Sequence, residues 1–167
     1  PIRWSFFQNI GDNMGRGKDE DIKKAIREMM QNNVMRLVIH GQGNSAERYH
    51  QNRSLFLYLE IRDTRPQIRY LYDLSEAVFL GRSEEENQVC IQDRMVSRYQ
   101  GRIWAEDGGV YYADEDGVGN PVKIRRKLWT SVLKPGERIR LKTKDCLIVG
   151  TVKITVRLFM GEQELFG

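Results

Sequence analysis

Residues 152–158 read Val-Lys-Ile-Thr-Val-Arg-Leu, a strict alternation of apolar and polar side chains. Successive side chains of a β-strand point to opposite faces, so a period of two indicates a strand with one face in a core. Residues 55–61 place leucine or isoleucine at every second position, and residues 68–72 continue the alternation after a turn at 63–66. These segments place the fold among the β-sheet proteins.

Shorter β-like pieces fill the chain between these strands. About ten short strands over residues 53–160, separated by turn residues, are typical of an antiparallel sandwich or barrel. Residues 106–109 (Glu-Asp-Gly-Gly) indicate a hairpin, and residues 135–136 (Pro-Gly) indicate another turn. We predict an all-β fold, a two-sheet antiparallel β-sandwich. Its expected core includes Leu55, Leu57, Ile103, Val152, Ile154 and Val156.

The N-terminal part of the chain has a different period. Apolar residues from Ile22 to Met30 recur at helical spacing, and acids precede bases in a way that suits the helix dipole. Asp19 is a suitable N-cap, so we predict a helix at about 19–33. Its apolar stripe needs a cover, which the outer surface of the sandwich, a second copy of the chain or another part of a longer protein would supply.

Three regions follow from these patterns. We expect an N-terminal extension over 1–52, the sandwich over 53–160 and a tail over 161–167. Residues 41–53 are polar and glycine-containing, as expected of a linker. Because the chain begins at Pro1 rather than methionine, we expect it to be a piece of a longer protein.

Composition excludes several classes of function. The 27 basic and 23 acidic residues are interleaved, so the net charge of +4 does not point to a nucleic-acid partner. No phosphate-binding glycine loop, zinc-protease helix or nucleophile elbow is present, and we expect neither an enzyme nor a cofactor.

The cysteines and the hydropathy indicate the compartment. The only two cysteines, Cys90 and Cys146, lie in apolar runs and read as reduced thiols of a cytoplasmic protein. Neither they nor the two histidines have zinc-ligand spacing. No apolar stretch is long enough to span a membrane, which leaves a span elsewhere in a longer protein open.

Three segments carry residues suited to binding an anion. Residues 79–83 end a strand with Gly81-Arg82, residues 95–103 place Ser97-Arg98 before a strand, and residues 114–122 form a turn-rich loop with Asn120. A phosphate monoester has three acceptor oxygens, so its binding site needs converging donors. Arginine supplies a permanently charged fork, and serine supplies a neutral hydroxyl.

The order of these segments resembles the forkhead-associated (FHA) family. That family carries Gly-Arg, then Ser-Arg with a histidine two places on, then a loop of the form Asp-x-Ser-x-Asn-Gly-Thr, and a late Leu-x-x-Gly-Asp. This sequence offers Gly81-Arg82, Ser97-Arg98, Asp116 with Asn120, and Leu133 to Glu137 in that order, with Asn87 at a further family position. The resemblance covers about 75–160 by motif, and implies an FHA/SMAD-like sandwich over 53–160 with an N-terminal helical extension.

The resemblance also implies roles. Arg82 and Ser97 would contact a phosphate, Arg98 or Arg94 would assist, and Asn120 would hold the main chain of the bound peptide. The implied partner is a phosphothreonine-containing protein or peptide of a Ser/Thr kinase pathway. The chain would thus be a protein-interaction module.

The sequence departs from the family pattern at several positions. Gln100 replaces the histidine, and Val118 replaces the serine of the loop. Gly119 stands where some members supply a hydroxyl donor, and Pro121 and Val122 replace the final Gly-Thr. Loss of one donor would weaken binding about tenfold, or roughly 1.4 kcal/mol.

Two alternatives remain open. The fold could act as a phosphate-independent scaffold or oligomerisation domain. It could also be a nucleic-acid-binding β-barrel, in which Trp104, Tyr111 and Tyr112 stack on bases, although these aromatics suit core packing equally well. The basic run at residues 125–127 is typical of a solvated surface.

Overall fold

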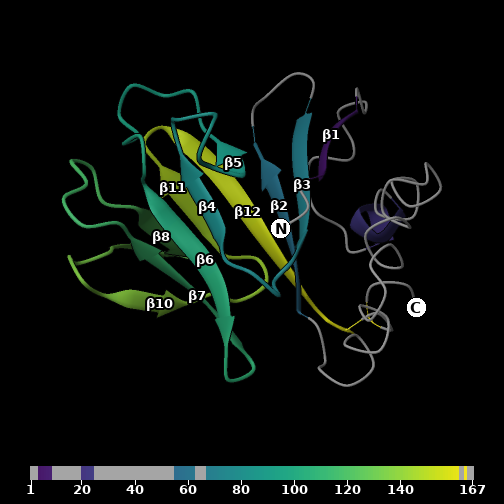
Figure 1. The fold of residues 1–167 in the computed structure, drawn as a ribbon. Coiled ribbons are helices and arrows are strands. Elements are labelled where there is room, and N and C mark those ends of the chain that lie inside the picture. Colours follow the sequence, from purple (N-terminus) through teal and green to yellow (C-terminus); the bar gives the residue numbers. More distant parts are fainter. Residues whose placement is uncertain (1–3, 9–19, 25–54, 63–66, 162–163, 165–167) are drawn as a thin grey trace.

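The protein is a sandwich of two β-sheets (Figure 1). The computed structural model describes residues 4–8, 20–24, 55–62, 67–161 and 164. The larger sheet contains, in spatial order, β1 (Trp4–Gln8), β3 (Gln67–Asp73), β2 (Leu55–Ile61), β12 (Val152–Met160), β11 (Cys146–Val149), β8 (Lys123–Arg126) and β9 (Trp129–Val132). The smaller sheet contains β10 (Arg138–Arg140), β7 (Gly109–Asp114), β6 (Gly101–Glu106), β4 (Val78–Gly81) and β5 (Val89–Cys90). The predicted all-β sandwich is confirmed.

Neighbouring strands run antiparallel, with one difference from the prediction. β4 and β5 pair in parallel, with Leu80 opposite Val89. A parallel pair cannot be joined by a tight hairpin. Residues 82–88 therefore form a longer loop between these strands, and this loop becomes part of the candidate site.

The core lies between the sheets. Five of the six predicted core residues are buried there, and Val152 packs against the cluster while partly exposed. The hairpin predicted at 106–109 also forms. Asp107 and Gly108 both have positive φ, the conformation that a two-residue turn between twisted strands requires.

The central strand β2 is buried on both faces. Leu55, Leu57 and Ile61 face the core between the sheets. Phe56 and Tyr58 point to the opposite face and are also buried, at 1% exposure each. At β2, the outer face of the larger sheet is therefore covered rather than open to solvent.

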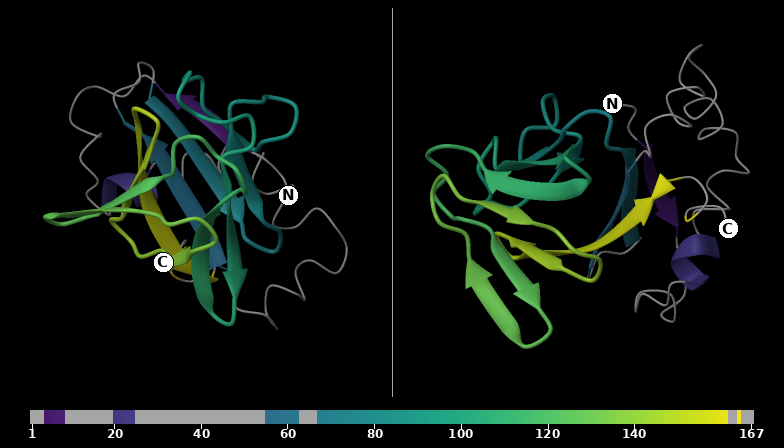
Figure 2. Two further views of the ribbon diagram at one scale, coloured as in Figure 1. Left: turned by 90° about the vertical axis from the view of Figure 1, so that its left-hand side faces the viewer. Right: turned by 90° about the horizontal axis from the view of Figure 1, so that it is seen from below.

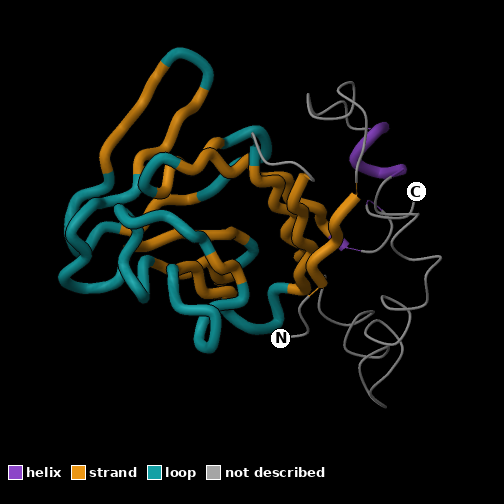
Figure 3. Tube along the Cα trace, turned by 90° about the horizontal axis from the view of Figure 1, so that it is seen from above, coloured by secondary structure: helices purple, strands orange, loops and turns teal. Residues whose placement is uncertain are grey.

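The N-terminal region joins the sandwich through β1. This strand pairs antiparallel with β3, from Trp4 opposite Leu71 to Gln8 opposite Gln67. Residues 20–24 are helical, within the helix predicted at 19–33, and Ile22 is buried. Figure 3 shows this helical turn on the side of the larger sheet away from the smaller one. The rest of the predicted helix, the linker at 41–53 and the turn at 63–66 lie outside the described residues.

Both cysteines are free, as expected of reduced thiols. Cys146 is buried in β11, whereas Cys90 in β5 is partly exposed. No helix in the described part of the chain is long and apolar enough to cross a membrane.

Candidate functional site

The candidate site begins where β4 ends at Gly81. A Cβ atom at this position would lie 2.7 Å from Nδ2 of Asn87 and still closer to the carbonyl oxygen of Arg98. Only glycine fits this approach. The absence of a side chain at Gly81 lets the loops after β4 and before β6 meet directly.

Main-chain hydrogen bonds hold these two loops together. The amide of Arg82 donates to the carbonyl oxygen of Ser97 at 3.0 Å, and the amide of Ser83 donates to that of Arg98 at 3.3 Å. The buried Asn87 side chain then donates from Nδ2 to the carbonyl oxygens of Ser83 and Arg98, both at 2.8 Å. This pairing fixes Arg82 beside Ser97 and Arg98.

Gln100 connects the loop before β6 to the loop after β7. Its side chain is fully buried; Oε1 accepts the amide of Ser97 at 3.0 Å, and Nε2 donates to Oδ1 of Asp114 at 3.2 Å and to the carbonyl oxygen of Asn120 at 3.0 Å. The residue that replaces the family histidine therefore braces both loops. An amide can do so because it donates and accepts from the same side chain.

Asp114 completes this bracing at the start of the β7–β8 loop. Oδ1 accepts from the hydroxyl of Tyr112 at 2.8 Å, and Oδ2 accepts from the amide of Val122 at 3.0 Å. Tyr112 is fully buried, and burial is the largest cause of the raised pKa of its hydroxyl, ahead of the neighbouring Asp114 carboxylate. Tyr112 thus remains a neutral donor.

The braced loops surround a groove of about 740 Å³. Its lining comes from β4, from the loop before β6, and from the loops that follow β4 and β7. The lining residues are Phe79, Arg82, Glu86, Ser97, Arg98, Tyr99, Glu115, Asp116, Gly117 and Val118. The groove therefore combines two guanidinium groups and the hydroxyls of Ser97 and Tyr99 with three carboxylates.

The guanidinium groups of Arg82 and Arg98 are exposed. Within the described part of the chain, no carboxylate lies within ion-pair distance of either group. On the acidic side, a hydrogen bond with Glu86 is the main cause of the raised pKa of Tyr99. The two arginines thus keep their donors available for an external anion.

Three of the five sequence-predicted site residues meet in this groove: Arg82, Ser97 and Arg98. Asn120 and Arg94 are exposed but do not line it. Nδ2 of Asn120 instead donates to the carbonyl oxygen of Met95 at 3.0 Å, which ties the β7–β8 loop to the loop before β6.

Sequence reasoning did not identify Glu86, Tyr99 and Glu115 as site residues. Tyr99 directly follows Ser97-Arg98, and Glu86 ends an acidic run after Arg82, so proximity in sequence was the available signal. No group of His, Cys, Asp or Glu among the described residues is arranged to hold a metal ion.

The geometry does not favour the base-stacking alternative. Tyr112 is buried and cannot reach a base. The side chains of Trp104 and Tyr111 contact each other, and their rings are partly covered by the guanidinium groups of Arg102 and Arg138, at 5.1 and 4.3 Å from the ring centroids. These aromatics therefore take part in packing on the surface of the smaller sheet.

Replacing Gln100 with leucine is expected to lower the free energy of unfolding by about 2 kcal/mol, because the part-buried amide of Ser97 and the part-buried carboxylate of Asp114 each lose a partner. The midpoint of urea unfolding measures this change. The matched control, Gln92→Leu, alters an exposed glutamine and should stay within roughly 0.5 kcal/mol of the parent. Equal midpoints for Gln100→Leu and the parent would contradict the bracing role.

No family model and no curated protein matches the sequence. Solved structures do match it in fold. The FHA domain of the CT664 protein from Chlamydia trachomatis is 18% identical, with a TM-score of 0.51 over 62% of this chain and 96% of that one. The FHA domain of an Arabidopsis thaliana hypothetical protein is 22% identical, with a TM-score of 0.52 over 65% of this chain and 88% of that one.

A third match is Mycobacterium tuberculosis EmbR in complex with a low-affinity phosphopeptide. It is 18% identical, with a TM-score of 0.50, over 64% of this chain and 25% of that one. At this level of identity the likenesses describe architecture. The sandwich of this chain has the fold of a forkhead-associated domain.

Proposed function

We propose that this chain is a protein-interaction module that holds a phosphothreonine-containing peptide in the groove between the β4–β5, β5–β6 and β7–β8 loops. The observation that carries the proposal is the convergence of Arg82, Ser97 and Arg98 in one groove. Two permanently charged forks and a hydroxyl match the acceptor oxygens of a phosphate dianion.

Preorganisation of the loops supports this role. Asn87 and Gln100 are buried and use their amides to fix the loop main chain. A rigid site loses less conformational entropy when the ligand binds, so more of the interaction energy appears as affinity. Because threonine phosphorylation requires a protein kinase, the partner would be a substrate in a Ser/Thr kinase pathway.

The acidic residues of the groove add a preference for the sequence around the phosphate. Glu115 and Asp116 follow β7 and line the same groove as the two arginines. A carboxylate repels a second anion and attracts a cation, so peptides with lysine or arginine beside the phosphothreonine fit better than peptides with acidic flanks.

A phosphothreonine peptide library with random flanking positions tests both parts of the proposal. Retained peptides should carry the phosphate and be enriched in lysine and arginine. The double variant Glu115→Gln/Asp116→Asn should bind a basic-flanked peptide about fivefold more weakly. Each substitution removes one attraction between a carboxylate and a basic peptide residue, and solvent partly screens that attraction.

The matched control is Glu85→Gln/Asp107→Asn, which removes two exposed carboxylates that do not line the groove. Its affinity should equal that of the parent. If both double variants weaken binding alike, the effect comes from net charge and the assigned specificity fails. Retention of the unphosphorylated library to the same extent would refute the phosphate role.

A phosphate-independent scaffold is the second candidate function. Val118 lines the groove at a position where the family loop carries a serine, so this chain offers an apolar group there instead of a donor. A parent protein that retains no phosphopeptide but forms stable complexes through the same groove would favour this alternative.

A further inference from the structure

The β8–β9 hairpin, residues 123–132, is a projecting arm at one edge of the larger sheet. β8 pairs with β9 from Lys123 opposite Val132 to Arg126 opposite Trp129, which leaves a two-residue turn of Lys127 and Leu128. Figure 2 shows the green hairpin extending away from the body of the sandwich. β9 ends the strand order of its sheet, so only β8 among the described strands pairs with it.

The tip of the hairpin exposes large apolar side chains. Leu128 is 97% exposed and Trp129 is 78% exposed, and every residue of β9 is exposed. The turn residue Lys127 has a φ of 49°, a left-handed conformation that favours glycine or asparagine. The sequence therefore places a lysine at a turn position where local backbone preference would select another residue.

The hairpin is also strongly basic. Residues 123–134 contain five lysines and arginines and no aspartate or glutamate. Lys123, Arg125 and Lys127 have no ion-pair partner among the described carboxylates. This arm therefore presents one sign of charge beside its apolar tip.

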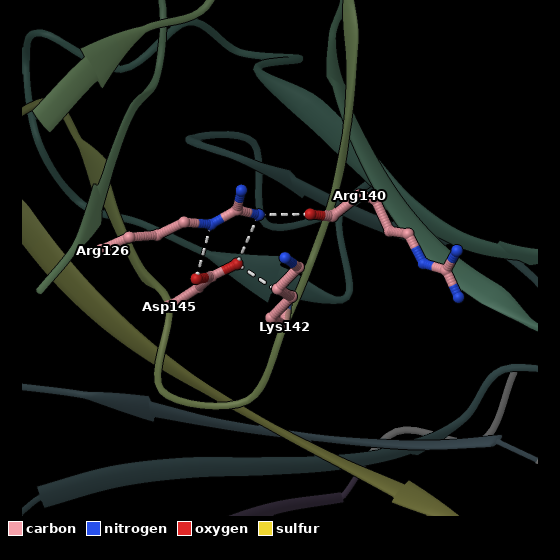
Figure 4. Close-up of polar contacts among 4 residues, drawn as sticks. All are labelled: Arg126, Arg140, Lys142 and Asp145. Atoms are coloured by element: carbon pink, nitrogen blue, oxygen red, sulfur yellow. Dashed lines mark hydrogen bonds and ion pairs between the residues drawn. The ribbon is translucent and has the colours of Figure 1, made fainter. Parts of the chain in front are cut away.

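Arg126, the last residue of β8 before the turn, ties the hairpin to the sandwich. Its Nε and one terminal nitrogen donate to the two carboxylate oxygens of Asp145 at 2.8 and 2.9 Å, and the same terminal nitrogen donates to the carbonyl oxygen of Arg140 (Figure 4). The Asp145 carboxylate also accepts the amide of Lys142 at 2.7 Å. This bracing holds the end of β8 next to the turn, so the exposed tip is presented on a fixed support.

We propose that the β8–β9 hairpin docks this protein on an anionic lipid surface. Leu128 and Trp129 enter the boundary between headgroups and acyl chains, where tryptophan is favoured, while Lys123, Arg125 and Lys127 contact anionic headgroups. Pairing of this arm with the same arm of a second copy is disfavoured, because two hairpins of like charge repel each other.

Binding of the full chain to lipid vesicles tests the proposal. Flotation with vesicles of phosphatidylcholine mixed with phosphatidylserine should retain the protein at least about tenfold better than vesicles of phosphatidylcholine alone, with loss of the difference at high salt. Tryptophan emission should shift to shorter wavelength on the mixed vesicles only, and this shift should be absent from Trp129→Ser.

Matched variants separate insertion from simple charge attraction. Leu128→Ser/Trp129→Ser changes two exposed side chains and should reduce binding at least about tenfold, since apolar burial contributes to interfacial affinity. Met160→Ser removes an exposed methionine outside the hairpin and should bind like the parent. Lys123→Gln/Arg125→Gln/Lys127→Gln should also lose most of the binding to mixed vesicles.

Three results would overturn the proposal. The first is that both kinds of vesicle retain the protein equally, or that neither kind retains it. The second is unchanged binding of Leu128→Ser/Trp129→Ser, which would leave only electrostatic adsorption. The third is a concentration-dependent dimer in sedimentation that this double variant abolishes, which would assign the hairpin to self-association.

Discussion

Replacing Arg82 with alanine is expected to weaken binding of a phosphothreonine peptide by at least about thirtyfold, or roughly 2 kcal/mol. The guanidinium of Arg82 lies beside Ser97 and Arg98 in the groove, and a charge-assisted hydrogen bond to a dianion is among the stronger polar contacts in water. Titration calorimetry with one peptide selected from the library measures the change.

Arg94→Ala is the control for this variant. Arg94 is an exposed arginine of the loop before β6 that does not line the groove, so its removal changes the net charge equally without removing a groove donor. Its affinity should stay within about threefold of the parent. Wild-type affinity in Arg82→Ala, or an equal loss in both variants, would show that the phosphate does not bind at Arg82.

Gly81→Ala is expected to destabilise the protein by about 3 kcal/mol. The added methyl group would overlap the carbonyl of Arg98 and the amide of Asn87, both main supports of the candidate site. Neither group is the end of a flexible exposed side chain, so the loops must separate. The urea unfolding midpoint should fall, and phosphopeptide affinity should fall with it.

Gly119→Ala provides the comparison. No heavy atom lies within 4 Å of a Cβ built at Gly119, and its φ is not in the left-handed region, so the substitution should be close to neutral. If Gly81→Ala unfolds at the same urea concentration as Gly119→Ala, the close approach of the two loops is not rigid. The bracing assigned to Asn87 would then be in doubt.

The predicted fold was accurate for strands that bury one face in the core and leave the other face partly exposed, because their side chains alternate between apolar and polar. β12 alternates clearly because Ile154 and Val156 face the core while Lys153 and Thr155 are partly exposed. β2 shows why this rule is incomplete. Both of its faces are covered, so its outward positions hold Phe56 and Tyr58 instead of polar residues.

Three other strands, β1, β8 and β9, lacked a usable local signal. β1 forms through pairing with β3, which is distant in sequence, and five residues are too few for a period to be recognised. β8 and β9 surround the basic run at residues 125–127, which resembles an irregular solvated segment because the hairpin exposes it. Pairing between strands, rather than side-chain pattern, defines these elements.

The candidate site was predicted from the order of short motifs, and only part of it follows from residue chemistry. Arginine and serine can be recognised as phosphate donors in any sequence, but their convergence depends on the Gly81 contact. The bracing role of Gln100 could not be predicted from the sequence, because its three hydrogen bonds join segments that only the folded chain brings together. The amide of Asn120, predicted to hold the main chain of a bound peptide, donates to the carbonyl oxygen of Met95 within the loops.

The pairing of β2 with β12 also determines when the sandwich can form. Leu55 lies opposite Met160 and Ile61 lies opposite Ile154, so the two central strands of the larger sheet are nearly at opposite ends of the sandwich sequence. Contacts of such long sequence separation slow folding, because the entropy of closing the intervening loop is lost before the contacts form. During synthesis, one edge of β2 stays unpaired until β12 has left the ribosome. A chain that stops before residue 154 therefore exposes the unpaired edge of an apolar strand to other protein molecules.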